Sequence, residues 1–197
     1  MEIPNGYHAL PHGKIASIVT YLEMTSPPVQ LENPAPEGLT VELVRNADLG
    51  WYRGLFQRIG EDWLWFSRLV LSDSELRAII DHPLVDLYVL KRDGTDAGLL
   101  ELDRRVPGEV ELAFFGLTKE VIGKGAGRYL IGEAIRMAWA HKPSRFWLHT
   151  CTLDSPQALG FYQKAGFRPY TRAIEVADDP RLTNKLPREV ASWFPVL

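Results

Sequence analysis

The segment Ile122-Gly123-Lys124-Gly125-Ala126-Gly127 lies between the apolar run Val110 to Leu117 and a helical pattern from Arg128 to Ala140. Its glycines let consecutive backbone amides approach a ligand with no Cβ in the way. The helix that follows directs its free N–H groups and the positive end of its dipole at the same place. We therefore predict an anion cradle that holds a phosphate or pyrophosphate.

Two familiar nucleotide-binding loops fit this segment poorly. A P-loop requires a Lys-Ser/Thr pair after its last glycine, and none follows Gly127. A Rossmann loop belongs on a first βα turn, with a ribose-binding acid about twenty residues further on, whereas this loop lies past the middle of the chain. The segments around the loop must therefore decide its function.

A second motif follows the strand-like stretch Arg145 to Leu153. It runs Ala158-Leu159-Gly160-Phe161-Tyr162-Gln163-Lys164-Ala165-Gly166-Phe167. This motif resembles the late helix and next-strand entry of the GNAT superfamily of acyl-CoA-dependent N-acetyltransferases. The glycine loop is similar to that family's Gln/Arg-x-x-Gly-x-Gly/Ala acetyl-CoA signature. Two motifs at compatible spacing are more specific than either alone, and the resemblance covers roughly residues 40 to 176.

The resemblance implies an α/β fold of the α+β type, with a mixed, largely antiparallel central sheet flanked by helices and here an extra N-terminal strand. It implies an N-acetyltransferase in which a primary amine attacks acetyl-CoA, the co-substrate, directly. No covalent enzyme intermediate is expected, because Cys151 lacks a recognisable nucleophile motif. Two alternatives stay open: a catalytically inactive acyl-CoA-binding sensor or assembly module, and a structural partner protein that pairs through its N-terminal strand.

Composition narrows the classes of partner. The chain has 197 residues, 46% of them hydrophobic, and a formal net charge of −3. We expect one domain (40–197, with a C-terminal extension) preceded by a strand and Pro-rich linker (1–39). Without a broad basic face or a long apolar run, we expect neither nucleic acid nor membrane as a partner. The acceptor would be a small-molecule or peptide amine, and a homodimer is possible.

A single cysteine and the lack of a basic, then apolar, leader favour a reducing, cytoplasmic location. The histidines and the cysteine form no cluster at zinc spacing, so no metal is expected. Periodicity and turn signals predict the following elements: strands at 14–24, 40–45, 85–91, 98–106, 110–117 and 145–153, helices at 47–59 and 72–81, an extended linker at 26–38, and turns at 93–94 and 107–108. The apolar stripe of the helix after the loop is expected in the core: Leu130, Ile131, Ala134, Ile135 and Ala138.

Glu111 is the first candidate for the base that takes the amine proton, because the resemblance places a glutamate at this strand position. Its apolar neighbours would partly desolvate the carboxylate and raise its pKa. The alternative is a half-exposed strand glutamate. His149, which shares a strand face with Trp147 and Cys151, is the second candidate, and its alternative is a packing role.

Tyr162 resembles the family's tyrosine near the thioester sulfur, which donates a hydrogen bond or a proton to the leaving thiolate. Its alternative is a core aromatic. Gly166 would end that helix in a left-handed turn. Asp154 or Ser155 would cap the helix start, with Pro156 in the first turn.

Further cofactor contacts are implied by the resemblance. Main-chain groups of Phe115, Gly116, Leu117 and Thr118 would meet the pantetheine arm and the acetyl oxygen. The loop contributes Ile122, Gly123, Lys124, Gly125, Ala126, Gly127 and Arg128. Ile122 stands where the family usually has Gln or Arg, and Ser155 where an asparagine often contacts pantetheine, so side-chain assistance there is in doubt.

The acceptor pocket would be walled by the first two helices and their connection. That segment holds Trp51, Tyr52, Phe56, Glu61, Asp62, Trp63, Trp65 and Phe66. Aromatic rings beside two acids suit an apolar or cationic amine, although the same residues also suit helix packing and a solvated surface. No charge pattern identifies the acceptor.

Overall fold

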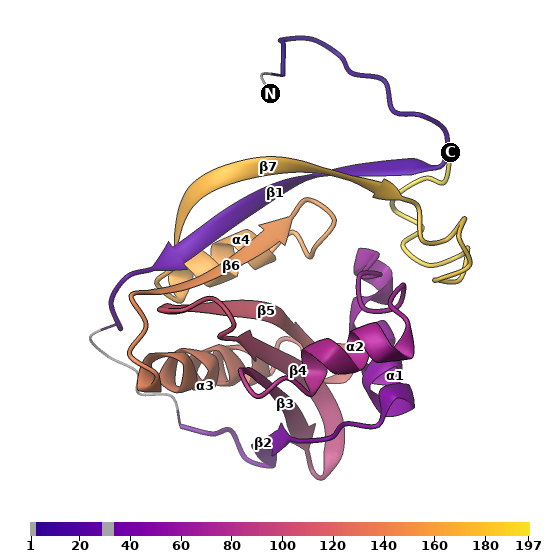
Figure 1. The fold of residues 1–197 in the computed structure, drawn as a ribbon. Coiled ribbons are helices and arrows are strands. Elements are labelled where there is room, and N and C mark those ends of the chain that lie inside the picture. The colour runs from indigo at the N-terminus through magenta and orange to yellow at the C-terminus, as the bar shows by residue number, and fades with distance from the viewer. Residues whose placement is uncertain (1–2, 29–33) are drawn as a thin grey trace.

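The computed structural model describes residues 3–28 and 34–197, which form one seven-stranded sheet with four α-helices (Figure 1). The strand order is β2-β3-β4-β5-β6-β1-β7, and among these residues only β5 and β6 pair in parallel. The strands are β1 (Lys14–Met24), β2 (Leu39–Val44), β3 (Val85–Arg92), β4 (Thr95–Asp103), β5 (Glu109–Leu117), β6 (Arg145–Cys151) and β7 (Arg168–Asp178). The α-helices are α1 (Leu49–Gly60), α2 (Asp73–Ile80), α3 (Ala126–Ala140) and α4 (Ala158–Lys164), and 3-10 turns lie at Glu61–Trp63 and Lys119–Val121. The predicted fold class is confirmed.

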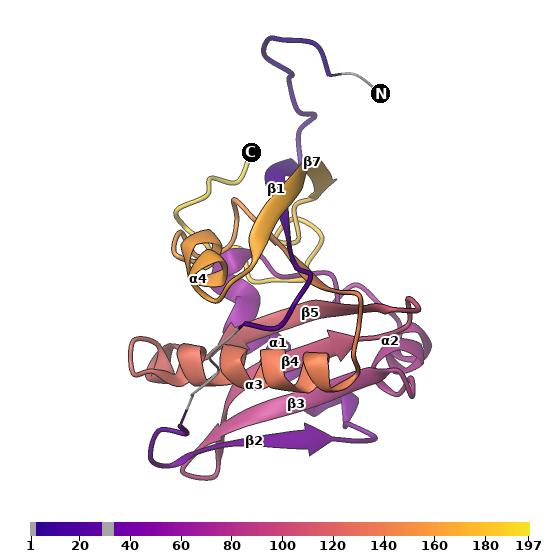
Figure 2. The ribbon, with the colours of Figure 1, turned by 90° about the vertical axis from the view of Figure 1, so that its left-hand side faces the viewer.

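Helices cover both faces of the sheet (Figure 2). Helices α1 and α2 pack on one face against Leu87, Val89 and Leu99. Helices α3 and α4 pack on the other, where the predicted apolar stripe of α3 is buried against strand residues such as Leu100 and Leu102. Leu99 and Leu100, which are neighbours on β4, therefore pack into different cores on the two sides of the sheet, because successive strand side chains point to opposite faces. No helix in the described ranges has both the length and the apolarity to cross a membrane.

Three consecutive strands form the predicted antiparallel meander β3-β4-β5. Asp93 and Gly94 make the first turn, both with positive φ, as the hairpin signal indicates. In the second hairpin, the register places Asp103 opposite Glu111. Ala113 has no partner on β4, which is a β-bulge in the middle of β5.

The N-terminal strand lies inside the sheet. The predicted strand 14–24 is confirmed as β1, and it pairs with β6 on one side and β7 on the other. It thus completes the sheet of its own chain, one of the two roles open to it. Of the predicted linker 26–38, residues 29–33 lie outside the described part.

The parallel pair β5–β6 separates soon after it begins. Pairing covers only Glu109, Val110 and Glu111 on β5, opposite 145–147 on β6. Beyond Glu111 the strands diverge, so the side of β5 that faces β6 is left without a strand partner. This opening lies directly before the glycine loop and can admit a narrow ligand.

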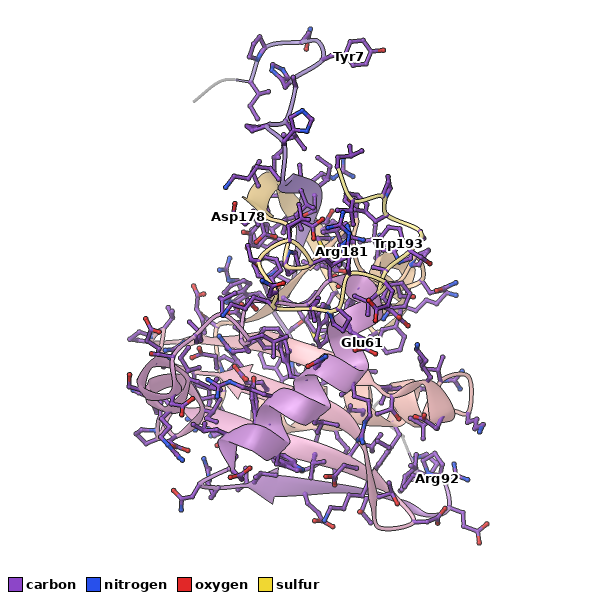
Figure 3. All side chains as sticks on the ribbon, turned by 90° about the vertical axis from the view of Figure 1, so that its right-hand side faces the viewer. Tyr7, Glu61, Arg92, Asp178, Arg181 and Trp193 are labelled. Carbon is purple, nitrogen blue, oxygen red and sulfur yellow. The ribbon has the colours of Figure 1, made fainter. Side chains whose placement is uncertain are left out.

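Residues after β7 form an irregular segment that packs near the end of α1 (Figure 3). Its Arg181 is 3% exposed and binds Asp179 through two N–H groups, at 3.0 and 2.8 Å. Arg181 Nη1 also donates to main-chain oxygens of Val190, Ala191 and Phe194. One buried arginine thus ties this segment together.

Candidate active site

The glycine loop and the start of α3 form an open cradle. Gly123 and Gly125 have φ of 79° and 83°, which side chains other than glycine rarely adopt. Gly125 is the N-cap of α3, no side chain caps that end, and its first turn holds no acid. The helix therefore offers backbone N–H groups and a positive dipole end to an anion, as the sequence predicts.

A cavity of about 1240 Å³ runs from this loop through the gap between β5 and β6. Most predicted cofactor-binding residues line it: Phe115, Gly116, Leu117, Ile122, Gly123, Gly125, Gly127, Arg128, Ser155 and Tyr162. An elongated ligand with a phosphate-bearing end fits this shape, with its anion at α3 and its thin arm along β5. The residues present thus suit acetyl-CoA.

Three predicted cofactor residues lie outside the lining of the cavity. The backbone N–H of Thr118 already donates to the Ala97 oxygen at 2.9 Å. Lys124 Nζ donates to the Glu120 oxygen at 2.8 Å. Ala126 is fully buried beneath the helix start. Thr118 and Ala126 could contact the cofactor only through main-chain groups. Lys124 could do so only if its side chain left the Glu120 oxygen.

Gly116 allows close packing behind the cavity. A Cβ at this position would lie 2.3 Å from Ile59 Cγ2 and 2.9 Å from the Trp65 ring. Only glycine lets α1 and Trp65 lie directly on β5. Gly116, which is predicted to offer main-chain contacts to the cofactor, therefore also sets the distance between β5 and the residues Ile59 and Trp65.

Glu111 lies on β5 at the point where β6 turns away, and it lines the cavity. Burial raises the pKa of its carboxyl to about 7, with further contributions from the negative charges of Asp103 and Glu101. Arg68 and Arg105 oppose this rise. Near neutral pH this carboxyl can therefore both take up and release a proton.

His149 lies beside Glu111, across the gap between the strands. Its Nδ1 is 3.7 Å from Glu111 Oε1, and its ring centroid is 5.6 Å from that of Tyr21. Its side chain is 45% exposed, so it is not a buried packing residue. The two candidate bases, separate in the sequence, are brought together at one place.

Tyr162 is buried on α4, and it lines the cavity opposite β5. Its ring contacts those of Phe115, Phe161 and Phe167. Burial, and then the charge of Asp154, raise the pKa of its phenol. Tyr162 therefore stays protonated at neutral pH, and its packing in the core is compatible with the predicted role as a hydrogen-bond donor.

A family model described as the Acetyltransferase (GNAT) family matches residues 53–167. The chain belongs to the GNAT acetyltransferase family. The match covers the segment from α1 through α4, including the glycine loop, Glu111 and Tyr162. A comparison with curated proteins finds no match.

Solved structures of other GNAT proteins share the fold. A GCN5-related N-acetyltransferase from Sphaerobacter thermophilus superposes with a TM-score of 0.62 at 16% identity, over 83% of this chain and 52% of that one. A putative GNAT acetyltransferase from Novosphingobium aromaticivorans gives 0.58 at 17% identity, over 86% and 68%. An aminoglycoside acetyltransferase from an uncultured soil metagenomic sample gives 0.53 at 16% identity, over 70% and 90%. The present chain thus spans about half the length of the Sphaerobacter protein.

Of the aromatic residues predicted to wall an acceptor pocket, fewer than expected line this cavity. Trp63, Trp65 and Phe66 line it. Tyr52 and Phe56 are fully buried in the core instead. Trp51 also lies away from the cavity, and its Nε1 donates to Asp96. The predicted acids Glu61 and Asp62 are likewise absent from the lining.

Other charged residues take the place of those two acids. The cavity is also lined by Arg68, Asp103, Arg105, Asp154 and Glu175. Sequence reasoning missed all five in this role. For Asp103 the turn signal was misleading, because a two-residue turn at 107–108 would pair residue 104 with residue 111, whereas the observed register pairs Asp103 with Glu111.

Arg68 links the wall to the core. It binds the fully buried Glu101 through Nη2, and its guanidinium lies 4.7 Å from the centre of the Phe114 ring. Tyr52 donates to the other Glu101 oxygen at 2.9 Å. The buried carboxylate is thus satisfied from α1 and from the wall, which fixes the wall against the sheet.

Neither residue predicted to cap α4 is its N-cap: Asp154 accepts no hydrogen bond from the helix start, and Ser155 Oγ accepts from the Gln157 N–H at 3.4 Å, in the turn before the helix. Gln157 is the N-cap of α4 and makes no side-chain cap. The carboxylate of Asp154 instead accepts from Thr150 Oγ1, the Cys151 N–H and Trp65 Nε1, at 2.7, 2.9 and 3.0 Å. Two donors at the end of β6 and the Trp65 indole N–H take up the carboxylate in place of the helix start, and Asp154 thereby positions Trp65. Gly166 ends α4 with φ of 104°, close to the expected turn.

Proposed function

We propose that this protein is an N-acetyltransferase that transfers the acetyl group of acetyl-CoA to a primary amine by direct attack. The main support is one observation: Glu111, with a pKa of about 7, lies in a cavity that joins an anion cradle to an aromatic wall. Membership of the GNAT family supports acetyl transfer in general. The compartment we expect is the cytoplasm.

Each residue would act at a defined atom. The amine nitrogen forms a bond to the thioester carbonyl carbon as the C–S bond breaks, and Glu111 accepts the amine proton, directly or through water. Glu111 and His149 are close enough for His149 to hold the carboxylate in position. Main-chain groups of Phe115 to Leu117, on the side of β5 without a strand partner, suit the carbonyl oxygen.

Tyr162 suits the departing sulfur. A phenol with a raised pKa holds its proton more tightly than a thiol does. Donation of a hydrogen bond is therefore favoured over complete proton transfer, and water then protonates the thiolate. Such a hydrogen bond strengthens as negative charge develops on sulfur. It therefore stabilises the transition state more than the bound substrate, and so accelerates the reaction.

The acceptor is a small-molecule or peptide amine. Around the aromatic wall, the carboxylates of Asp103, Glu111, Asp154 and Glu175 outnumber the two guanidiniums of Arg68 and Arg105. This balance favours an acceptor that arrives as a cation, loses one proton to solvent before the attack, and loses a second to Glu111 as the N–C bond forms. Trp63 and Phe66 offer ring faces to the rest of such an amine.

The first prediction concerns Glu111 and tests the proposal. Because a protonated Glu111 cannot accept the amine proton, kcat/KM should rise as pH increases through about 7. Glu111→Gln should lower kcat by about a hundredfold or more, with the Kd of acetyl-CoA unchanged. Thiol release is measured across an amine panel, and calorimetry gives the affinity.

Glu109→Gln is the matched control. Glu109 lies two residues earlier on the same strand and binds Arg145 outside the cavity, so this variant should retain parent activity. Full turnover in Glu111→Gln would assign the base to His149. Tight acetyl-CoA binding without thiol release for any amine would favour the alternative, an acyl-CoA-binding sensor or assembly module.

A further inference from the structure

Strand β7 is a long edge strand that little of its own chain covers. It is the last strand of the sheet and pairs with β1 on one side only. Ten of its eleven residues are exposed, and only Ala177 is partly buried. Residues 14–18 of β1 pair with β7 alone, and this two-stranded ribbon extends upward from the rest of the sheet (Figure 2). Such an edge is ready to pair with another strand.

One face of this ribbon is apolar and exposed. Ile174 and Val176 on β7 are 49% and 54% exposed, and Ile18, opposite Ile174 on β1, is 42% exposed. The other edge of the sheet is different, because β2 has only six residues and holds the ion pair between Glu42 and Lys91. Natural proteins protect edges by shortness, charge and proline. β7 is not short, and although it carries Pro169 near its start and charged residues at 168, 172, 175 and 178, the residues Ile174 and Val176 near its centre are apolar and exposed.

The side chains along this face are self-complementary. Alternate residues of a strand share a face, so Arg172, Ile174, Val176 and Asp178 lie together. This set runs from positive through apolar to negative. In an antiparallel copy the order is reversed, which places each Arg172 opposite an Asp178 and each Ile174 opposite a Val176. A twofold axis that passes beside Glu175 produces this register, and two identical surfaces then match.

We propose that β7 pairs edge to edge with β7 of a second copy, in this register, to form a dimer with a continuous sheet. Backbone hydrogen bonds along the edge supply the association, and the Arg172–Asp178 and Ile174–Val176 pairs set the register. A single strand edge makes a small interface, so the dimer should dissociate on dilution. The proposal is independent of the acetyl-transfer reaction.

The register also brings two like charges together, and their repulsion predicts how one substitution changes the stability of the dimer. On the other face of β7, Glu175 lies opposite its own copy across the axis, and like charges directly opposite each other destabilise a strand pair. Glu175→Gln should therefore lower the dissociation constant of the dimer. Because Glu175 also lines the cavity, the acceptor ends of the two copies would lie near the axis.

Sedimentation velocity on the full chain tests the second prediction, up to a concentration of about 500 µM, which covers weak interfaces. The parent protein should dimerise with increasing concentration. Arg172→Asp and Asp178→Arg should each weaken the dimer by about tenfold or more, because each makes two like-charged pairs. An equimolar mixture of the two variants should restore it, since every cross-pair is then attractive. Val176→Lys should also weaken the dimer, because it places a charge in the apolar pair with Ile174. Val106→Lys, at an equally exposed apolar residue away from β7, is its control and should leave the dimer unchanged.

Cysteine cross-linking tests the register itself, in a Cys151→Ser background. Residue 175 faces its own copy, so Glu175→Cys should form an intermolecular disulfide. Ala173→Cys should not, because the two cysteines would be about 14 Å apart along the strand. Asp178 binds Lys14 at 2.6 Å in the monomer, so thermal unfolding must confirm that Asp178→Arg is folded. A parent monomer at every concentration, or a dimer that Arg172→Asp leaves unchanged, overturns the proposal.

Discussion

Glu111 lies among four charged residues, and their balance determines how readily it takes a proton. Asp103 and Glu101 raise its pKa beyond the effect of burial, while Arg68 and Arg105 lower it. The apolar neighbours of Glu111 in the sequence predicted the effect of burial. The flanking charges come from β4 and from the segment after α1, so only the register of the hairpin and the packing of the wall reveal them.

The third prediction concerns Tyr162. Tyr162→Phe keeps the ring in its cluster with Phe115 and Phe161 but removes the hydrogen bond to the leaving sulfur. A hydrogen bond to a developing anion accounts for about a ten- to hundredfold change in rate. We expect kcat to fall by that factor, while calorimetry shows an unchanged Kd for acetyl-CoA.

Tyr88→Phe provides the comparison for this variant. Tyr88 packs against the same core and its phenol pKa is also raised by burial, but it lies outside the cavity lining. This variant should keep full turnover. If Tyr162→Phe also keeps full turnover, Tyr162 is a core aromatic and the leaving thiolate needs only water as its hydrogen-bond and proton donor.

At the scale of elements, local sequence signals predicted most of the fold. Hydrophobic periodicity and turn residues located the strands of the meander and helices α1 to α3 within a few residues. Asp48 and Ser72 cap α1 and α2 with their side chains, which explains why these helices start slightly later than their patterns. The separation of β5 from β6 depends on non-local pairing, and no local pattern indicates where pairing stops.

The fourth prediction tests the glycine loop as an element that binds an anion. Gly127 lies in the first turn of α3 and lines the cavity, and a Cβ there would make ordinary contacts of 3.5 Å with Leu117 and 3.6 Å with Phe161. Gly127→Val therefore fills the cradle without the backbone strain that Gly125→Val would cause. We expect the calorimetric affinity for CoA to fall by about tenfold or more.

Gly54→Val is the matched control for this loop variant. It introduces the same β-branched side chain into α1 at a residue that does not line the cavity, and no atom lies within 4 Å of the new Cβ. Both variants should show similar melting temperatures. An unchanged CoA affinity in folded Gly127→Val would mean that the pyrophosphate binds elsewhere.

At the scale of the whole molecule, the two ends of the chain complete a domain whose family match covers only residues 53–167. Ile15 of β1 and Leu186 and Ala191 of the last segment share one small core with Leu64, which lies next to the acceptor wall. Trp193 Nε1 donates to the Asp62 oxygen at 2.9 Å, beside Trp63. Residues outside the family match thus support Trp63 and Leu64, which line the cavity, and the family motifs alone could not predict this.

The last prediction concerns the buried ion pair that ties down this final segment. Arg181→Met leaves the carboxylate of Asp179, which is 2% exposed, without its partner, and should lower the free energy of unfolding by about 3–5 kcal/mol. Asp179→Leu combined with Arg181→Met removes both charges and should recover part of that loss, although three main-chain oxygens still lose their donor. Urea denaturation measures both, and equal losses would show that the lost main-chain bonds, rather than the stranded charge, dominate. Because the segment supports Trp63 through Trp193, Arg181→Met should also raise the KM for the amine while leaving the Kd of acetyl-CoA unchanged.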